Sequence, residues 1–123
     1  MKKILVIEDD KYFRENAKIA LKRRGYEVFT SRNGSEGFDL AKEILPDLIL
    51  CDIMMPEHDG YWVIEQVRND YDLTNTPFIF MTAKVEHEDV QLGLRLGADD
   101  YLVKPFKLAE LMKTIELKIK KDF

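Results

Sequence analysis

The feature that most constrains the fold is a set of short apolar runs that each end in acidic residues. Residues 48–51 (LILC) are followed directly by Asp52, and residues 3–7 (KILVI) are followed by Glu8 and Asp9. Apolar runs of this length are typical of strands that are buried on both faces of a sheet. The sequence therefore predicts two buried strands that deliver carboxylates at their carboxyl ends.

Helical spacing of apolar residues alternates with such runs along the chain. Three further strands are predicted at residues 26–30, 77–81 and 100–103, with a helix between consecutive strands and a fifth helix after the last one. Short connections between alternating strands and helices favour a parallel sheet covered on both faces. We expect an α/β, flavodoxin-like doubly wound fold with a five-stranded parallel sheet in the order 2-1-3-4-5.

Capping residues and apolar stripes mark the expected helices. Asn33 with Glu36 three residues later resembles a capping box, and Asp10 is expected to cap the first helix or face water rather than join the acidic set. Trp62 and Leu117 fall on predicted outer faces. The last helix is expected to bury five apolar residues, namely Leu108, Leu111, Met112, Ile115 and Ile119.

Length and composition fit one globular domain over residues 1–123. Hydrophobic residues make up 46% of the chain and charged residues 34%, and the apolar runs are too short to cross a membrane. With no signal-peptide pattern, a cytoplasmic location is expected. The net charge of −4 argues against direct nucleic-acid binding. Cys51 is the only cysteine, which excludes an internal disulfide, and we expect it to be a small buried hydrophobe.

The predicted sheet order places several polar side chains at one edge. Glu8, Asp9 and Asp52 follow the first and third strands, and Thr82 and Lys104 follow the fourth and fifth. Two unit charges about 4 Å apart repel by roughly 4 kcal/mol at an effective dielectric of about 20, so clustered carboxylates need a cation. Oxygen ligands favour Mg²⁺. A carboxylate nucleophile, a metal, a hydroxyl and an ammonium are the parts needed to accept a phosphoryl group.

Four motifs in this order resemble the receiver domain of bacterial two-component response regulators. They are residues 7–10 (IEDD), 52–60 (DIMMPEHDG), 81–83 (MTA) and 101–106 (YLVKPF), and the resemblance runs from Met1 to about residue 121. It implies that Asp52 is the phosphoacceptor, acted on by a histidine kinase or phosphotransfer protein.

The resemblance also implies a metal set and a switch. Glu8 and Asp9 would hold Mg²⁺, with Mn²⁺ as the alternative ion, together with Asp52 and the backbone carbonyl of Met54. Thr82 and Lys104 would contact the phosphoryl oxygens, and Thr82 with Tyr101 would form the switch. The bond between Lys104 and Pro105 is a candidate for the cis form, which X-Pro bonds adopt at modest cost.

The expected output is a change of partner binding rather than catalytic turnover. A downstream protein or a second copy would bind the fourth helix (about 86–96), the fifth strand (100–103) and the fifth helix (from 108). On the fourth helix, Val90 and Leu94 form one apolar stripe and Leu92 and Leu96 form another, which is more apolar surface than one sheet contact requires. Leu117 and Trp62 add to the predicted outer surface, although scattered exposed apolar residues are normal.

Two other functions compete with this interpretation. An aspartyl-phosphate phosphatase of the haloacid dehalogenase type needs a second Asp two residues after the nucleophile, where this chain has Met54. A module that binds proteins without taking phosphate is disfavoured by the complete acidic set.

Met54 and Lys84 flank the acceptor at positions that influence water access in the family, and a bulky Met54 predicts slow self-dephosphorylation. The absence of an output segment after the last helix fits a stand-alone regulator and a receiver cut from a longer protein equally well.

Overall fold

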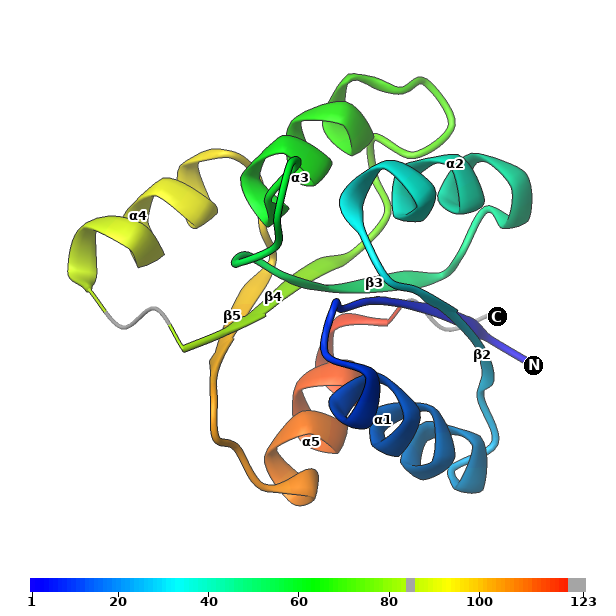
Figure 1. Ribbon diagram of the computed structural model, residues 1–123. Coiled ribbons are helices and arrows are strands. Elements are labelled where there is room, and N and C mark those ends of the chain that lie inside the picture. Colours follow the sequence, from blue (N-terminus) through cyan, green and yellow to red (C-terminus); the bar gives the residue numbers. More distant parts are fainter. Residues whose placement is uncertain (84–85, 120–123) are drawn as a thin grey trace.

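A computed structural model of the chain describes residues 1–83 and 86–119. Strands and helices alternate along the chain as the sequence predicts, and Figure 1 shows a central sheet between two layers of helices. The elements are β1 (Lys3–Ile7), α1 (Lys11–Arg23), β2 (Glu27–Ser31), α2 (Gly34–Ile44), β3 (Leu48–Asp52), α3 (Gly60–Asn69), β4 (Phe78–Thr82), α4 (His87–Arg95), β5 (Asp100–Val103) and α5 (Leu108–Lys118).

The sheet has the predicted order β2-β1-β3-β4-β5, and every neighbouring pair is parallel. The chain goes from β1 to β2 on one side and then crosses to β3 on the other, so the strand order reverses between β1 and β3. In open α/β sheets, ligands bind outside the carboxyl ends of the strands at this reversal. Ile7 pairs with Cys51, which places the residues that follow β1 next to Asp52.

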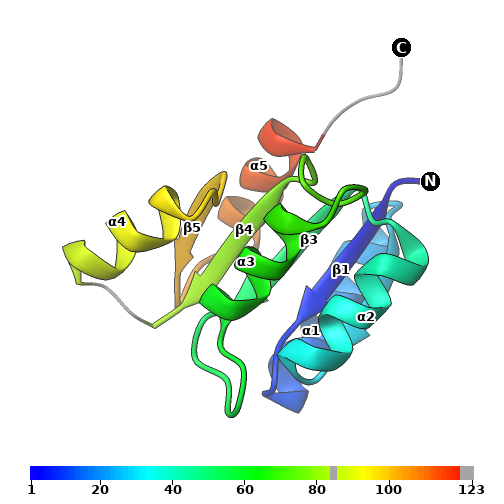
Figure 2. The same ribbon diagram turned by 90° about the horizontal axis from the view of Figure 1, so that it is seen from above.

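Both faces of the sheet are buried under helices. Helices α1 and α5 cover one face, and α2, α3 and α4 cover the other (Figures 1 and 2). Alternate residues of β1 serve the two layers, because Ile4 packs with the α1 and α5 core whereas Leu5 packs with the α2 and α3 core. Every residue of β3 and β4 is buried, as their uninterrupted apolar runs predict.

Side-chain oxygens cap the amino ends of three helices, two of them at the predicted residues Asn33 and Asp10. Asp10, Asn33 and Asp59 each accept a backbone N–H bond from the first turn of α1, α2 and α3 respectively. After α1 the chain turns at Gly25, whose φ of +93° is the left-handed conformation that glycine adopts without steric cost. These caps fix where α1, α2 and α3 begin relative to the strand before each of them.

Two predictions about individual side chains are wrong. Trp62 does not lie on a bare outer face, because its ring stacks on His58 with centroids 3.9 Å apart and meets Phe38 of α2 edge-on. Leu108 is 46% exposed rather than buried, because as the first residue of α5 it lies at the rim of an apolar groove between α1 and α5. Leu117 is 70% exposed, as predicted.

Within the part of the chain that the structure describes, no helix combines the length and the apolar character that crossing a membrane requires.

Candidate functional site

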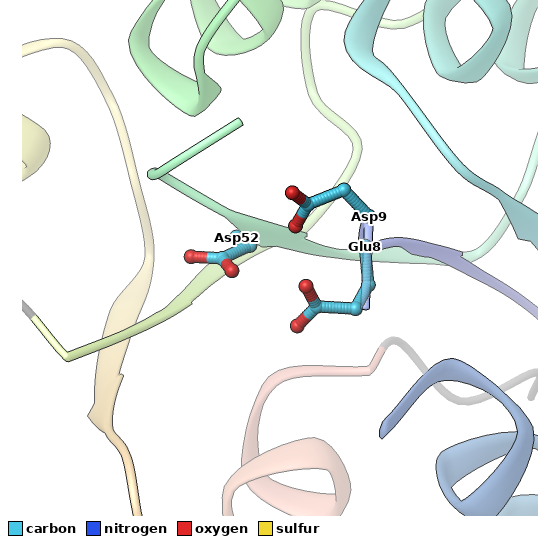
Figure 3. A group of neighbouring side chains, drawn as sticks. All are labelled: Glu8, Asp9 and Asp52. Carbon is cyan, nitrogen blue, oxygen red and sulfur yellow. The ribbon is translucent and has the colours of Figure 1, made fainter. Parts of the chain in front are cut away.

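Three carboxylates meet at the carboxyl edge of the sheet, where the strand order reverses. Glu8 and Asp9 follow β1, and Asp52 ends β3, the neighbouring strand. Each contributes an oxygen that lies within 4.8 Å of the others (Figure 3). Glu8 is fully buried and Asp52 is 7% exposed, whereas Asp9 faces the solvent. The predicted convergence of these acids is therefore present in the structure.

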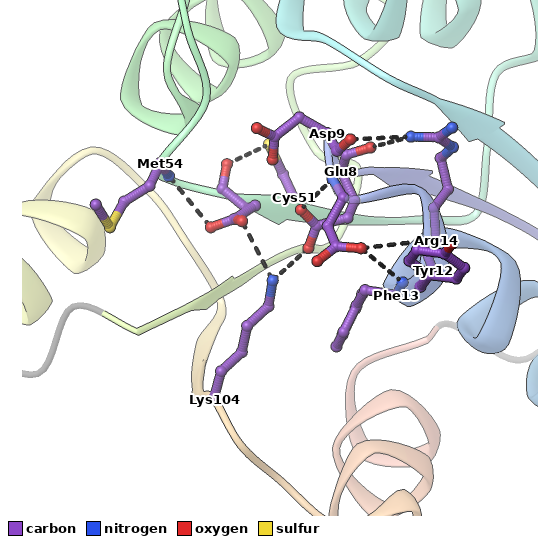
Figure 4. Close-up of polar contacts among 10 residues, drawn as sticks. Glu8, Asp9, Tyr12, Phe13, Arg14, Cys51, Met54 and Lys104 are labelled. Atoms are coloured by element: carbon purple, nitrogen blue, oxygen red, sulfur yellow. Dashed lines mark hydrogen bonds and ion pairs between the residues drawn. The ribbon is translucent and has the colours of Figure 1, made fainter.

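A single ammonium group bridges the two buried acids. Lys104 follows β5, and its Nζ donates a hydrogen bond to Oε1 of Glu8 and another, of 3.2 Å, to Oδ2 of Asp52 (Figure 4). The same Nζ lies 4.1 Å from the ring centroid of Phe13 on α1, in the geometry of a cation–π contact. The Lys104–Pro105 peptide bond is cis.

The electrostatics of the cluster follow from burial. Burial raises the pKa of the Glu8 carboxyl to about 7; the Lys104 hydrogen bond lowers it, but the negative charge of Asp52 raises it again. Burial lowers the pKa of the Lys104 ammonium, but its hydrogen bond to Glu8 and the charges of both acids outweigh burial and raise it above its ordinary value. The site therefore retains a cation and has negative charge that is only partly neutralised.

Backbone groups hold the Asp52 side chain on its other side. Its Oδ1 accepts a 3.1 Å hydrogen bond from the Met54 N–H, so each carboxylate oxygen has a donor. The Met54 side chain is 55% exposed. A Cβ at Gly60 would lie 2.5 Å from the carbonyl oxygen of Asp52, so only glycine allows α3 to begin this close to the acceptor strand.

Thr82 and Tyr101 lie on the two strands beyond β3. Thr82 ends β4 and is fully buried at the edge of the sheet where Asp52 lies. Tyr101 on β5 is half-buried, with its ring edge-on to Phe80 at a centroid distance of 6.1 Å. Burial raises the pKa of Tyr101 to about 12, with smaller contributions from Tyr61, Asp89 and Asp52. Lys84, the other predicted flanking residue, lies outside the described residues.

Two residues of α1 support the site, although no sequence motif singled them out for it. Arg14 Nη1 donates to the backbone carbonyls of Glu8 at 2.8 Å and Asp9 at 3.4 Å, which fixes the loop that carries these acids (Figure 4). The ring of Phe13 packs beneath the Lys104 ammonium. Asp10 caps α1 as predicted, and its N–H donates to Oε2 of Glu8.

The donor chemistry of the cluster fits a hard metal ion. Glu8, Asp9 and Asp52 offer carboxylate oxygens alone, and the exposure of Asp9 leaves one side open to solvent. Their clustered negative charge, two of the three carboxylates being buried, is what a divalent cation would neutralise. These residues could hold a metal.

Fold and site together define a flavodoxin-like α/β protein with an acidic cluster at the reversal point of its sheet. The family model of the response regulator receiver domain matches residues 4–116. The chain therefore belongs to the response regulator receiver family, as its motifs predict.

Solved structures agree with this assignment. The chemotaxis protein CheY4 of Vibrio cholerae is 32% identical, with a TM-score of 0.93 over 97% of this chain and 99% of that one. The receiver domain of a signal transduction histidine kinase from Syntrophus aciditrophicus is 34% identical, with a TM-score of 0.88 over 95% and 89%. A receiver domain of a Pseudomonas aeruginosa sensor histidine kinase, with a magnesium ion coordinated in its active-site cleft, is 31% identical, with a TM-score of 0.88 over 95% and 96%.

Proposed function

We propose that this chain is a regulatory phosphoacceptor of the cytoplasm that takes a phosphoryl group on Asp52 from a histidine kinase or a phosphotransfer protein. The observation that carries the proposal is the setting of the Asp52 carboxylate. One of its oxygens accepts from the Met54 N–H and the other from the Lys104 ammonium, with Glu8 and Asp9 beside it. Phosphoryl transfer is catalysed by such positioning and charge neutralisation.

The transfer forms one bond and breaks one. A carboxylate oxygen of Asp52 attacks the phosphorus of a phosphohistidine, and the bond between phosphorus and the imidazole nitrogen breaks. The electron pair of that bond stays on the imidazole, which takes up a proton, and Asp52 becomes an acyl phosphate. Lys104 and the Thr82 hydroxyl are the proposed partners of the new phosphoryl oxygens.

Glu8, Asp9 and Asp52, with the backbone carbonyl of Met54, are the residues that would hold Mg²⁺ or Mn²⁺. The bound ion would supply neutralisation of the charge that builds up on the transferring phosphoryl group. An all-oxygen donor set with one exposed carboxylate supports this choice over zinc or copper. The magnesium ion in the Pseudomonas aeruginosa receiver domain also supports it.

The proposed output is a change in a binding surface made by α4, β5 and α5. A phosphoryl group adds about −1.5 to −2 charges and three acceptor oxygens, and bonding to these groups would move Thr82 and Tyr101. Leu92, Leu94 and Leu117 are 38%, 42% and 70% exposed, which supports docking of a downstream protein or a second copy there. Met54, whose backbone N–H bonds Asp52, carries a bulky apolar side chain beside the acceptor, and we propose slow self-dephosphorylation on that ground.

Mass spectrometry of the intact protein tests the proposal. After incubation with acetyl phosphate and Mg²⁺, we expect one added phosphoryl group, which peptide mapping assigns to Asp52. Asp52→Ala should gain none. Asp39→Ala removes an exposed carboxylate of α2 and should be labelled like the wild type. Equal labelling of Asp52→Ala and wild type would contradict the proposal.

A further inference from the structure

Helix α4 rests on the sheet through its backbone more than through its side chains. Among residues 88–95, whose side chains the structure describes, Gly93 alone is buried. A Cβ at Gly93 would lie 3.0 Å from the ring of Phe80 on β4, so the helix backbone packs directly on that ring. Since little buried apolar side-chain area holds α4 on the sheet, polar contacts to its first turn have a larger effect on where the helix lies.

One such polar contact comes from α3. The Tyr61 hydroxyl donates a 3.3 Å hydrogen bond to the backbone carbonyl of Asp89, in the first turn of α4. The Tyr61 ring meets the Phe80 ring edge-on, with centroids 5.7 Å apart. Burial, with the charge of Asp89, raises the pKa of Tyr61, so its hydroxyl keeps the donated proton at neutral pH. Tyr61 therefore joins α3 to α4 across the aromatic ring on which α4 lies.

The first turn of α3 is in turn fixed to the acceptor strand. The N–H of Gly60, one residue before Tyr61, donates a 2.9 Å hydrogen bond to the carbonyl of Ile53. The Gly60 backbone also lies against the carbonyl of Asp52, where a Cβ would come within 2.5 Å. Because the two backbones are already in close contact, a backbone shift at residues 52–53 displaces the first turn of α3 as well.

We propose that Tyr61 is a positioning residue that couples the backbone at Asp52 to the first turn of α4. The inference rests on the proposed phosphoacceptor function and adds a link to α4 that does not pass through Thr82 or Tyr101. The steps are the Asp52 backbone, the close contact with Gly60, and the hydrogen bond from Tyr61 to Asp89. Such coupling is reciprocal in binding free energy, so loosening α4 also changes the affinity of the Asp52 site for a phosphoryl group or its analogue.

Amide hydrogen exchange measured by mass spectrometry tests this coupling in the whole chain. Tyr61→Phe keeps the ring and removes the hydroxyl, and Tyr12→Phe is the matched control, since Tyr12 is 79% exposed on α1. In unmodified Tyr61→Phe we expect α4 amides to exchange roughly two- to tenfold faster than in wild type, because the helix has lost one stabilising hydrogen bond. When acetyl phosphate and Mg²⁺ are added, the exchange rate of the α4 amides should change in Tyr61→Phe by less than about half of its change in wild type and in Tyr12→Phe.

The affinity of the site for a non-covalent phosphoryl analogue separates coupling from a merely structural role. Under coupling, Tyr61→Phe changes the equilibrium affinity of the Asp52 site for beryllofluoride, measured in the presence of Mg²⁺. If α4 exchange rises equally before and after labelling and the beryllofluoride affinity is unchanged, Tyr61 only holds the helix and the inference is overturned, while the proposed function stands. If the wild type gains no phosphoryl group, the proposed function fails and the coupling with it. Should Tyr61→Phe fail to fold, Tyr61→Met, which keeps apolar bulk, takes its place with the same two outcomes.

Discussion

Glu8 makes the stability of the metal-free protein depend on pH. Its carboxyl is fully buried, and its pKa is raised from an ordinary value of 4.5 to about 7 in the folded state. A raised pKa contributes stability that is complete below pH 4.5 and is lost as the pH rises through about 7. At 1.36 kcal/mol per pKa unit, Glu8 accounts for a fall of about 3 kcal/mol. Glu8→Gln should remove this fall in urea unfolding measured with EDTA between pH 4.5 and 8.

A neighbouring acid provides the control for this pH dependence. Glu15 lies on the exposed side of α1, and Glu15→Gln should keep the wild-type fall in the free energy of unfolding. If Glu8→Gln shows the same fall as the wild type, burial of Glu8 is not the cause. A second expectation concerns Mg²⁺: bound at the proposed site it would stabilise the ionised carboxylates, and it should therefore flatten the wild-type curve above pH 6.

At the scale of elements, Arg68 joins three segments at the amino end of the sheet. This side chain of α3 donates to the carbonyls of Thr74, Thr76 and Gly97, at distances from 2.7 to 3.2 Å, and pairs with Asp99 at 3.1 Å. Arg68→Ala leaves several half-buried carbonyls without this donor. We expect the free energy of unfolding in urea to fall by about 2 to 3 kcal/mol.

Arg32 offers a matched comparison, because it also pairs with an acid but does so in solvent. Its side chain is 72% exposed and bonds Glu36 four residues later. Exposed pairs of this kind contribute about 0.5 kcal/mol or less, so Arg32→Ala should be nearly neutral. A loss in Arg68→Ala no larger than that in Arg32→Ala would show that the Arg68 contacts add no stability.

The elements could be predicted from the sequence because their signals are local. Observed strand bounds agree with the predicted ones to within one residue, and caps such as Asn33 are encoded by sequence motifs of a few residues. The acids of the site could be predicted for a related reason, since strand ends and strand order together place Glu8 beside Asp52.

Contacts between side chains of different elements could not be predicted from these local signals. The stacking of Trp62 on His58 depends on how the loop after β3 folds back on α3, and no periodicity encodes that path. The same holds for the Phe13 ring beneath Lys104, which joins residues 91 positions apart, and for the Arg68 contacts. Such contacts depend on the packing of whole elements, which the spacing of residues along one element does not specify.

At the scale of the whole molecule, Cys51 can report the opening of the entire sheet. It lies on β3, in the middle of the five strands, and is 0% exposed. Burial raises the pKa of its thiol well above the ordinary value, and the charge of Asp52 adds to this effect. Alkylation by iodoacetamide therefore requires unfolding of the central strand, and the chain has no second cysteine to obscure the signal.

Mg²⁺ should protect Cys51 from alkylation even though the thiol is not a proposed metal ligand. An ion that binds the folded state alone lowers the unfolded population by the factor 1 + [Mg²⁺]/Kd, so labelling should slow roughly 100-fold when Mg²⁺ is at about 100 times its Kd. Asp9→Asn removes one exposed carboxylate of the cluster and should weaken this protection while leaving the metal-free rate close to that of wild type. Equal protection in both proteins would mean that Mg²⁺ acts elsewhere on the folded chain, and no protection in either would remove the metal from the proposed mechanism.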